Sequence, residues 1–271
     1  MRIATLGPAG TFSELAACEF GRQLDTYTLQ FHPALAQVLK AIPQQADIAV
    51  VPIENIVEGV VSPVIDSFVK RPLEIIGELS IPVRFSLVAN HPEPQKIYAQ
   101  FVAQGQCSEC LGQYAVPIMN TASNSEALQL LQQSREPAAA VVPEHSLKQH
   151  SFAHVIHDIT DYAHNETRFV AVRETQAVTT EPDPDTAYKT SLLIIDDTDH
   201  PGLLVEHLQV FAAYRVNLTS LVSRPTGHRF GHYHFYIECE GHREDSAIRA
   251  ALTLIELRNK VVVLGSYPRG G

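Results

Sequence analysis

The sequence is poor in positive charge, and this scarcity narrows the classes of protein that it can represent. Lysine and arginine together number 20, against 30 aspartates and glutamates, which gives a formal net charge of −10. A general nucleic-acid binder relies on a basic surface, so that class is excluded. An anionic ligand would have to be held by local positive groups, because the overall field repels it.

Long hydrophobic runs and cysteines are also scarce. No apolar stretch approaches the roughly 20 residues that a membrane span requires, and the chain enters a strand-like pattern at once, with no charged and apolar leader. We therefore expect a cytoplasmic protein that contacts no membrane. The chain has 4 cysteines, which fits a reducing compartment where they serve as small buried hydrophobes. Cys107 and Cys110 have the spacing of half a zinc site, but no second pair lies at a fitting distance, so no metal site is predicted.

Residues 1 to about 172 alternate between strand and helix patterns, which is typical of an α/β fold. We expect strands at 2–6, 48–51, 86–89, 138–142 and 169–172, and helices at 13–22, 60–69 and 125–133. The helix at 125–133 directly precedes the apolar strand 138–142, as a crossover connection requires.

The segment 174–188 changes character. Its central part, 179–186, is acidic, polar and interrupted by prolines, which indicates a linker between domains; a long surface loop within one domain is the alternative. The pattern that follows is strand, helix, strand, strand, helix, strand, at 190–196, 202–214, 218–222, 232–240, 245–257 and 261–264. This βαββαβ order predicts a ferredoxin-like domain. Its helices would cover one face of the sheet, so the bare face or the sheet edge should promote self-association.

The turn after the first strand is the first candidate site. Thr11 and Glu14 have the spacing of a capping box at a helix start, and Gly10 permits close approach to the backbone. Unpaired backbone N–H groups at such a start bind anions. An ordinary tight turn between a strand and a helix is the alternative.

The second candidate site follows the strand 47–51. Glu54 and Asn55 stand beyond its carboxyl end, where open α/β sheets bind ligands. Asn55 could donate to a substrate carboxylate or hydroxyl, while Glu54 would accept from a substrate hydroxyl or orient Arg168. A polar turn is the alternative.

The third candidate places Thr167 and Arg168 side by side ahead of the hydrophobic segment 169–172. A hydroxyl next to a fixed positive charge can donate a proton to an anionic substrate. A strand start with a solvated arginine is the alternative for this segment alone.

Taken in order, the three segments resemble the motifs of the prephenate dehydratase family: Gly7–Glu14, then Pro52–Asn55 with Glu58–Gly59, then Thr167–Phe169. The tail resembles the ACT regulatory domain that follows in that family, through Pro201–Leu204, Asn217–Thr219, Ser223–Pro225 and Leu264–Pro268. The resemblance implies a catalytic domain at 1–178 with the two lobes of periplasmic binding proteins, the second lobe at about 81–160, and an ACT domain at 188–271.

The resemblance also implies a reaction. Prephenate would lose carbon dioxide and water to become phenylpyruvate, in phenylalanine biosynthesis, with no redox or metal cofactor. Thr167 is expected to donate to the departing ring hydroxyl, Arg168 to pair with a carboxylate or organise the site, and Phe169 to supply an apolar wall beside the reacting carboxylate.

The remaining implied contacts divide between substrate and effector. Substrate binding is expected from Gly10, Thr11, Glu54, Asn55 and Ser123, and effector binding from Gly202, Leu203, Asn217, Leu218, Ser223 and Arg224. The expected partners are prephenate, an amino-acid effector such as L-phenylalanine, and further copies of the chain in a homodimer or homotetramer.

Several positions depart from the family pattern. Ile56 and Val60 replace small polar residues, Asn124 replaces a threonine, and Arg84 stands where a histidine is usual. The segment from Gln104 to Cys107 takes the place of Ser-His-Pro-Gln.

In the tail, Val222 replaces a glutamate ahead of Ser223. The loss of that carboxylate predicts weak feedback by phenylalanine, or feedback by another amino acid. Two alternatives to the dehydratase remain: a prephenate decarboxylase on the same scaffold, which the presence of Thr167 disfavours, and a binding protein without turnover, which the departures favour.

Overall fold

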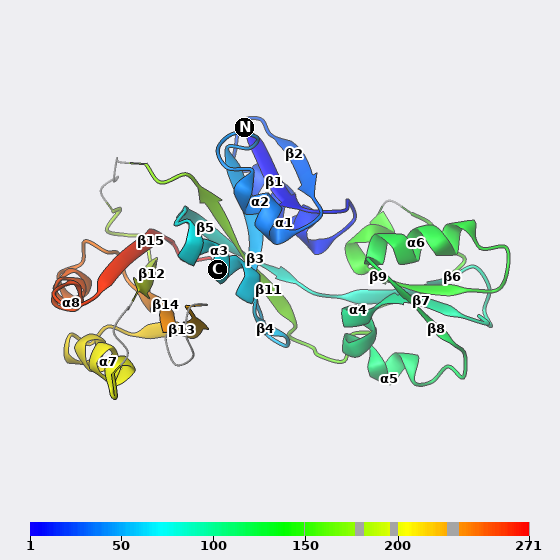
Figure 1. Cartoon of the computed structure of the whole chain (residues 1–271). Coiled ribbons are helices and arrows are strands. Elements are labelled where there is room, and N and C mark those ends of the chain that lie inside the picture. The colour runs from blue at the N-terminus through cyan, green and yellow to red at the C-terminus, as the bar shows by residue number, and fades with distance from the viewer. Residues whose placement is uncertain (149, 177–181, 196–199, 227–232, 271) are drawn as a thin grey trace.

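The computed structural model describes residues 1–148, 150–176, 182–195, 200–226 and 233–270, and Figure 1 shows them as a first lobe, a second lobe and a C-terminal domain. The fold is mixed α/β, as the alternating pattern predicts. Among the described residues, no helix is both long enough and apolar enough to cross a bilayer.

The first lobe is built on a sheet with the strand order β2-β1-β3-β11-β5, to which β4 adds by pairing with β3. Helix α1 packs on one face over an apolar cluster that contains Ile3, Phe20 and Phe169. Phe68 of α3 packs on the other face in a separate cluster. The elements are β1 (Arg2–Leu6), α1 (Phe12–Gly21), β2 (Thr28–His32), α2 (Leu35–Lys40), β3 (Ile48–Asn55), β4 (Gly59–Val60), α3 (Ser62–Lys70), β5 (Glu74–Pro82) and β11 (Glu166–Arg173).

Strand β3 is longer than its apolar run predicts, and this difference shapes the site. β11 pairs antiparallel with it, Thr167 opposite Asn55 and Arg168 opposite Glu54. The strand was expected to end at residue 51, because Glu54 and Asn55 are polar. Pairing with β11, more than 100 residues away in the chain, supplies the backbone hydrogen bonds that extend it.

The second lobe has the strand order β10-β6-β9-β7-β8. The interior strands β6 and β9 are buried along their whole length, because apolar clusters lie on both faces of this sheet. In Figure 1 the chain passes between the lobes at the ends of β5 and β11. The elements are β6 (Phe85–Ala89), β7 (Ile97–Gln100), α4 (Phe101–Gln106), α5 (Ser108–Leu111), β8 (Ile118–Thr121), α6 (Asn124–Gln133), β9 (Ala139–Pro143), a 3₁₀ helix (Glu144–Lys148) and β10 (His154–Ile156).

The C-terminal domain has the expected βαββαβ order and the strand order β13-β14-β12-β15. Helices α7 and α8 pack on one face of this sheet over Leu192, Phe211 and Ile255. The elements are β12 (Tyr188–Ile195), α7 (Leu203–Ala213), β13 (Leu218–Pro225), β14 (Tyr233–Glu240), α8 (Ser246–Glu256) and β15 (Lys260–Pro268).

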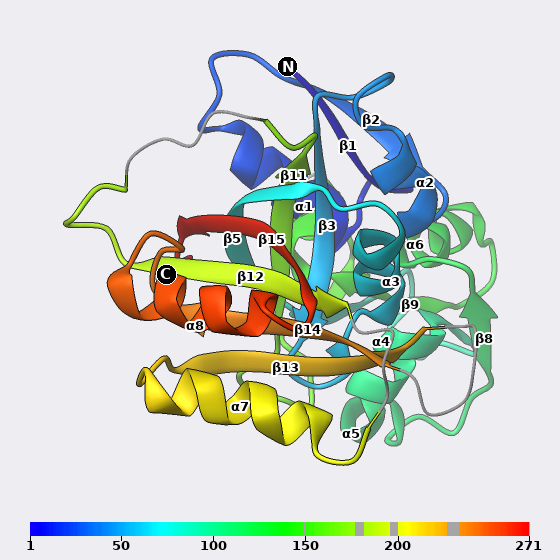
Figure 2. The ribbon, with the colours of Figure 1, turned by 60° about the vertical axis from the view of Figure 1, so that its left-hand side comes forward.

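The other face of this sheet is covered by the first lobe, which corrects the expectation that a bare face awaits a partner. Leu193, Tyr236 and Tyr267 lie in the same buried cluster as Phe68 of α3 and Ile75 of β5. Figure 2 shows the sheet in front of β5 and α3, with α7 and α8 on the outside. Of the two places where self-association was expected, only the sheet edge is left.

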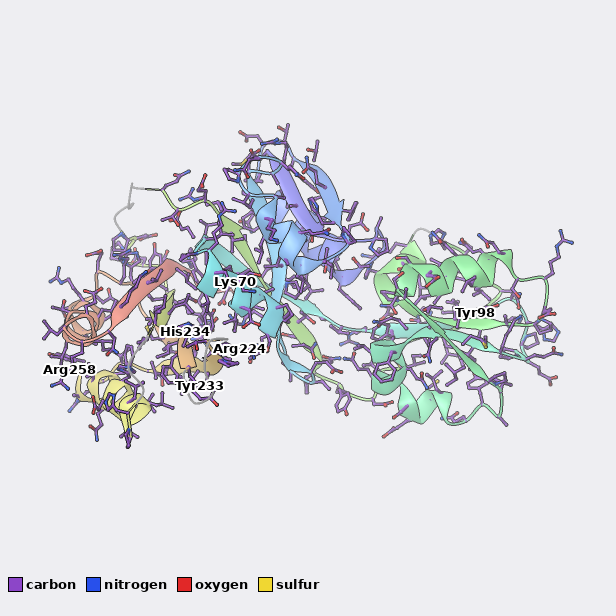
Figure 3. All side chains as sticks on the ribbon, in the orientation of Figure 1. Lys70, Tyr98, Arg224, Tyr233, His234 and Arg258 are labelled. Carbon is purple, nitrogen blue, oxygen red and sulfur yellow. The ribbon has the colours of Figure 1, made fainter. Side chains whose placement is uncertain are left out.

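Polar contacts reinforce this junction. The Arg224 guanidinium lies 2.7 and 2.8 Å from the Asp66 carboxylate oxygens and donates to Ser62 Oγ at 3.1 Å, so it ties β13 to α3. In Figure 3, Arg224 lies on the side of the C-terminal domain that faces α3. Its donors are used within the junction, which does not favour the expected role in effector binding, and that role stays a prediction.

Two of the four cysteines are buried as expected, while Cys18 and Cys110 are only partly buried. All four are free thiols, and Cys107 and Cys239 are fully buried. Burial raises the pKa of each of these two thiols to about 12, so they stay protonated at neutral pH. The described residues contain no group of three or more His, Cys, Asp or Glu side chains that could hold a metal ion.

Candidate active site

The side chains of Asn55 and Thr167 meet across the β3–β11 pair. Asn55 Nδ2 donates to Thr167 Oγ1 at 2.9 Å and to Asn165 Oδ1 at 2.9 Å. Asn55 Oδ1 accepts from the backbone N–H groups of Val57 and Glu58, both at 2.9 Å. Backbone N–H groups can only donate, so these contacts fix which end of the amide is oxygen.

Asn55 therefore holds other protein groups. Its amide hydrogens are directed at Asn165 and Thr167, and its oxygen caps the turn that follows β3. The expectation that Asn55 donates directly to a substrate does not fit this arrangement, because its donors are already used. Its geometry fits a residue that orients the Thr167 hydroxyl.

The Thr167 hydroxyl accepts one hydrogen bond and keeps its own hydrogen available for donation. Its oxygen accepts from Asn55, so its hydrogen points away from that bond. Within the described part of the chain, no protein acceptor is seen for this hydrogen. A hydroxyl held on one side and free on the other can donate to a bound substrate.

A polar chain connects this pair to the second lobe. Asn165 Nδ2 donates to Gln106 Oε1 at 2.9 Å, and Gln106 Nε2 donates to Glu58 Oε1 at 3.1 Å. Asn165 and Gln106 are each 3% exposed, and Asn55 is 8% exposed. Since Gln106 lies on α4, this chain spans both lobes and fixes their relative position at the site.

Gln106 was missed at the sequence level. The segment 104–107 was identified as a departure, with attention on Gln104, but Gln104 makes no side-chain hydrogen bond in the described residues. The signal that distinguishes the two glutamines is burial: Gln106 and Ala103 are buried on the inner side of α4. The spacing of the two residues in a helix of six could have indicated it.

Arg168 points away from Thr167, which corrects the expectation that hydroxyl and guanidinium act side by side. Successive residues of a strand face opposite sides. Arg168 contacts Glu54 at 2.9 Å, Glu78 at 3.0 Å and Glu238 of the C-terminal domain at 2.9 Å. Burial alone would lower the pKa of the guanidinium, but the charges of Glu238 and the bond to Glu54 raise it above its ordinary value, so it stays charged.

Phe169 belongs to the core of the first lobe. Its side chain is 1% exposed and packs with Phe20 of α1 and Ile81 of β5. A bulge between Arg168 and Phe169 breaks the strict alternation at this point. The ring therefore packs the strand against the core of the first lobe, and the expected apolar wall beside a substrate stays a prediction that this burial does not favour.

Backbone N–H groups of the glycine turn and of the start of α1 are hydrogen-bonded by side chains of the turn and of α1. Thr11 is the N-cap of α1 and accepts from Glu14 N, as the capping box predicts, while the Glu14 carboxylate accepts from Gly10 N–H. This carboxylate takes one of the backbone donors that were expected to bind an anion. Because β1 and β3 are parallel, the turn still lies at the same edge of the sheet as Asn55.

The lobes touch beside this turn. Ser123 is the N-cap of α6 and accepts from Glu126 N at 3.1 Å, so its hydroxyl has a capping role. Ser125, which the sequence did not single out, donates to Ala9 O across the lobe boundary. The N-termini of α1 and α6 are thereby brought next to each other, and both present backbone N–H groups.

A histidine completes this contact. His145 packs edge-on against Phe12 at 5.3 Å between ring centroids, and its Nε2 is buried with no hydrogen-bond partner in the described residues. Burial lowers the pKa of His145, although Glu14 and the Gly10 backbone oppose the shift, so the ring is neutral at pH 7.

The other departures lie outside this network. Ile56 is 67% exposed at the tip of the turn. Arg84 pairs with Asp158 at 2.9 Å, and both side chains are 53% exposed. A half-exposed ion pair of this kind has little energetic weight.

The C-terminal domain contains a pocket of about 330 Å³ at the start of α7. Its lining includes the expected residues Gly202, Leu203 and Ser223, and adds Tyr233 and Phe235 of β14. Asn217 and Leu218 lie at the opposite end of β13, and Arg224 faces α3, so these three are not part of it. Gly202 has φ 93°, a left-handed conformation that favours glycine at this helix start.

Val222 does not line this pocket. It alternates with Ser223 on β13 and packs against the core shared by the C-terminal domain and the first lobe. The sequence-based reason for weak feedback, a missing carboxylate beside Ser223, therefore does not apply within one chain. A glutamate at this position would place a charge in an apolar junction.

The comparison with known families decides what this scaffold is. The family model described as prephenate dehydratase matches residues 3–177, and the model of the ACT domain matches residues 191–253. The chain belongs to the prephenate dehydratase family. It is therefore an enzyme of the carbon–oxygen lyase class, with an ACT domain at its C-terminal end.

Relatives of the family match nearly the whole chain. The prephenate dehydratase of Bacillus subtilis is 31% identical over 283 residues, covering 98% of each protein. The structure of prephenate dehydratase from Arthrobacter aurescens in complex with L-Phe matches with a TM-score of 0.85 at 30% identity, covering 99% of this chain and 90% of that one. The structure from Staphylococcus aureus matches with a TM-score of 0.83 at 29% identity, covering 98% and 100%.

The buried hydrogen bonds of Gln106 in this prephenate dehydratase scaffold lead to a testable prediction. Changing Gln106 to Leu removes the partner of Asn165 Nδ2 and of Glu58, so we expect the free energy of unfolding to fall by about 1–3 kcal/mol. We also expect kcat to fall by about 10-fold or more, because the support of Thr167 is loosened. Urea unfolding and turnover of prephenate measure the two effects.

The matched control is Gln104→Leu on the same helix. Gln104 makes no side-chain hydrogen bond in the described residues, so its loss should change stability by no more than about 0.5 kcal/mol. Equal effects of the two substitutions would show that the chain through Gln106 has no special role.

Proposed function

We propose that the chain converts prephenate to phenylpyruvate and that Thr167 assists the departing hydroxyl. The ring carboxylate leaves as carbon dioxide, its bonding electron pair enters the ring, and the carbon–oxygen bond at the opposite carbon breaks. The hydroxide takes a proton and leaves as water. The observation that carries this proposal is the Thr167 hydroxyl, oriented by Asn55 and with its hydrogen free for a substrate.

The contribution of Thr167 is positional. A threonine hydroxyl is a very weak acid, so it acts as a hydrogen-bond donor at the oxygen where negative charge develops. Net proton supply then comes from solvent. Asn55 and Asn165 are positioning residues in this scheme, because their side chains hold the hydroxyl and each other.

The substrate carboxylates are proposed to bind where the lobes meet. The N-termini of α1 and α6 lie side by side through the Ser125–Ala9 contact, and helix N-termini favour anions. The backbone around Gly10, Thr11 and Ser123 is thus the proposed carboxylate-binding surface. Glu54 is assigned to the support of Arg168, since its carboxylate is engaged there.

A product assay tests the reaction directly. The protein is incubated with prephenate, and the ultraviolet spectrum is recorded in alkali. Phenylpyruvate supports the proposal, a non-aromatic product indicates a decarboxylase, and unchanged prephenate indicates a binding protein without turnover. Either of the last two results overturns the assignment.

We also propose that an amino acid, L-phenylalanine, inhibits the enzyme by binding in the pocket at α7. The relative from Arthrobacter aurescens was solved in complex with L-Phe. The pocket combines an apolar surface from Leu203, Tyr233 and Phe235 with the backbone at Gly202 and the hydroxyl of Ser223. A phenyl ring and an amino-acid head group match these two kinds of surface.

The pocket assignment predicts the effect of Ser223→Asp. A carboxylate introduced beside Leu203 and Phe235 should raise the L-phenylalanine concentration for half inhibition by about 10-fold or more, because it opposes the effector carboxylate and is costly to desolvate. Turnover without effector should not change. Thr219→Asp is the matched control, an exposed position on β13 outside the pocket. If Ser223→Asp and Thr219→Asp are inhibited alike, the effector binds elsewhere.

The assembly is proposed to be a homodimer or homotetramer through the edge strand β13. β13 ends the sheet order, and Leu221 on it is 40% exposed. Sedimentation at several protein concentrations tests the assembly.

The proposed domains are a catalytic domain at 1–178, with its second lobe at about 81–160, and an ACT domain at 188–271. The proposed compartment is the cytoplasm, which is consistent with the free thiols.

A further inference from the structure

A buried cluster of charges joins the catalytic strands to the ACT domain. Arg168 Nη1 lies 2.9 Å from Glu238 Oε1 and 3.0 Å from Glu78 Oε2, and Arg168 Nη2 lies 2.9 Å from Glu54 Oε2. Lys189 Nζ lies 2.8 Å from Glu78 Oε2. We call these five residues the junction cluster; Glu238 and Lys189 come from β14 and β12 of the ACT domain, and the others from the first lobe.

The junction cluster is far from an ordinary surface ion pair. The exposed fractions of the side chains are 17% for Arg168, 8% for Lys189, 3% for Glu78 and 1% for Glu238, while Glu54 at the rim is 39% exposed. Tyr236 OH also donates to Glu238 Oε1 at 2.6 Å. Burying charges is costly, and such groups are frequently no more stabilising than apolar residues of the same size. A buried arrangement of this precision fits a role in geometry better than a role in stability alone.

Glu238 is the most buried member of the junction cluster, with a side chain that is 1% exposed. Its Oε1 is shared by Arg168 and Tyr236. Its Oε2 is buried and has no hydrogen-bond partner in the described residues, and Lys189 Nζ is 3.8 Å from it. The position of this carboxylate is thus set mainly by Arg168 and Tyr236, so β14 and β11 cannot shift independently without exposing an unpaired charge.

The same strands carry the proposed reacting pair. In the β3–β11 register, Arg168 is opposite Glu54, and the next pair along is Thr167 opposite Asn55. One face of this segment holds the Thr167 hydroxyl, and the other is held by the junction cluster. Arg168 and Thr167 are consecutive residues of β11, which is hydrogen-bonded to β3 on one side and to β5 on the other, so a displacement of Arg168 also displaces the paired backbone that carries Thr167.

We propose that Glu238 of the ACT domain is a positioning residue for the dehydratase site, acting through Arg168 on Thr167 and Asn55. The inference rests on the proposed function, since Thr167 is the group whose placement it controls. The ACT domain is thereby part of the support of the active site even without effector. Phe235, which lines the effector pocket, lies on the same strand as Glu238, so the pocket and the junction cluster share β14.

The first test compares Glu238→Gln with Glu240→Gln in the full-length chain. Glutamine keeps the shape of the side chain and removes its charge. For Glu238→Gln we expect kcat to fall by about 10-fold or more with KM changed by less than about threefold, since misplacement affects the reacting geometry more than ground-state binding. Glu240 lies on the same strand in an exposed pair with Arg269, so Glu240→Gln should retain both constants.

A double substitution separates positioning from general weakening. In a Thr167→Val background there is no hydroxyl left to place, so adding Glu238→Gln should lower kcat by less than about twofold further. If the two substitutions multiply their effects, Glu238 acts independently of Thr167 and the inference is overturned. A wild-type kcat for Glu238→Gln overturns it as well.

A second variant covers the case in which Glu238→Gln does not fold. Glu238→Asp keeps the charge but withdraws the carboxylate by one methylene group. We expect its kcat to fall by about threefold or more in protein that still unfolds cooperatively in urea. A normal kcat for this variant would contradict the inference. Wild-type protein that leaves prephenate unchanged sinks the proposed function instead, so the two failures are distinguishable.

Discussion

Replacing Thr167 by Val should lower kcat for prephenate by about 10²-fold or more while leaving the fold intact. Valine has nearly the same shape but no hydroxyl, so the donor at the departing oxygen is lost. Asn55 keeps Asn165 Oδ1 and the backbone oxygen of Glu166 as acceptors, at 2.9 and 3.1 Å, so no buried amide hydrogen is left without a partner. The rate of phenylpyruvate formation and a urea unfolding curve measure the two sides of this prediction.

The control for this prediction is Thr167→Ser, which restores the hydroxyl without the methyl group. It should recover turnover to within about 10-fold of the wild type, because the hydrogen bond from Asn55 can still orient it. Valine turning over at a near-normal rate would remove Thr167 from the reaction. Serine failing as badly as valine would mean that packing, and not the hydroxyl, is what the position supplies.

Gly265→Ala should lower the free energy of unfolding by about 3 kcal/mol or more. A Cβ built on Gly265 of β15 would lie 2.1 Å from the backbone oxygen of Ile75 on β5, well inside the contact distance of any pair of heavy atoms. The atom in the way belongs to the backbone of β5, so a side-chain rotation cannot relieve the clash, and the ACT domain must move off the first lobe. Urea unfolding of the full-length chain measures the loss.

Gly77→Ala is the matched control, because Gly77 lies on β5, the strand that carries Ile75. Its Cβ would meet only Phe20 Cε2 at 3.5 Å, an ordinary contact, so we expect a change of no more than about 0.5 kcal/mol. If Gly265→Ala proves as mild as Gly77→Ala, the close approach of β15 to β5 is not a feature of the protein in solution. The junction cluster would then lose its structural basis too.

The predictions for Thr167 and Glu238 share one geometric origin, the two-residue period of β11. Thr167 faces the second lobe and the polar chain through Gln106, while Arg168 faces the ACT domain and Glu238. A single strand therefore carries the proposed reacting hydroxyl on one side and the connection to the regulatory domain on the other. The ACT domain and the proposed reacting hydroxyl are therefore connected through two adjacent residues, Thr167 and Arg168.

The elements that local patterns predicted are present in the structure, but β2, β5, β7 and β8 were not among them. The capping box at Thr11 and Glu14 marks the start of α1, and the apolar runs at 48–51 and 138–142 mark β3 and β9. The order of strands and helices in the tail matches the observed βαββαβ order. These features depend on neighbours within a few residues, which a sequence displays directly.

The sequence was a poor guide where the partner of a side chain lies far along the chain. The sequence placed Thr167 and Arg168 side by side, but it does not show that their partners, Asn55 and Glu238, lie on opposite faces of β11. It also treated Arg224 as an effector ligand, although Asp66 binds it at 2.7 Å from 158 residues away.

By itself, the sequence determined the fold class, the βαββαβ tail and the segments in which the site is to be sought, because hydrophobic period and capping act over short distances. Only the tertiary structure decided which of those residues meet. In the structure Asn55 donates to Thr167, Gln106 of the second lobe accepts from Asn165, and Arg168 pairs with Glu238 of the ACT domain. The physical reason is strand register: pairing between distant segments fixes which face each side chain occupies, and a shift of one residue in the β3–β11 pair would exchange the faces of Thr167 and Arg168.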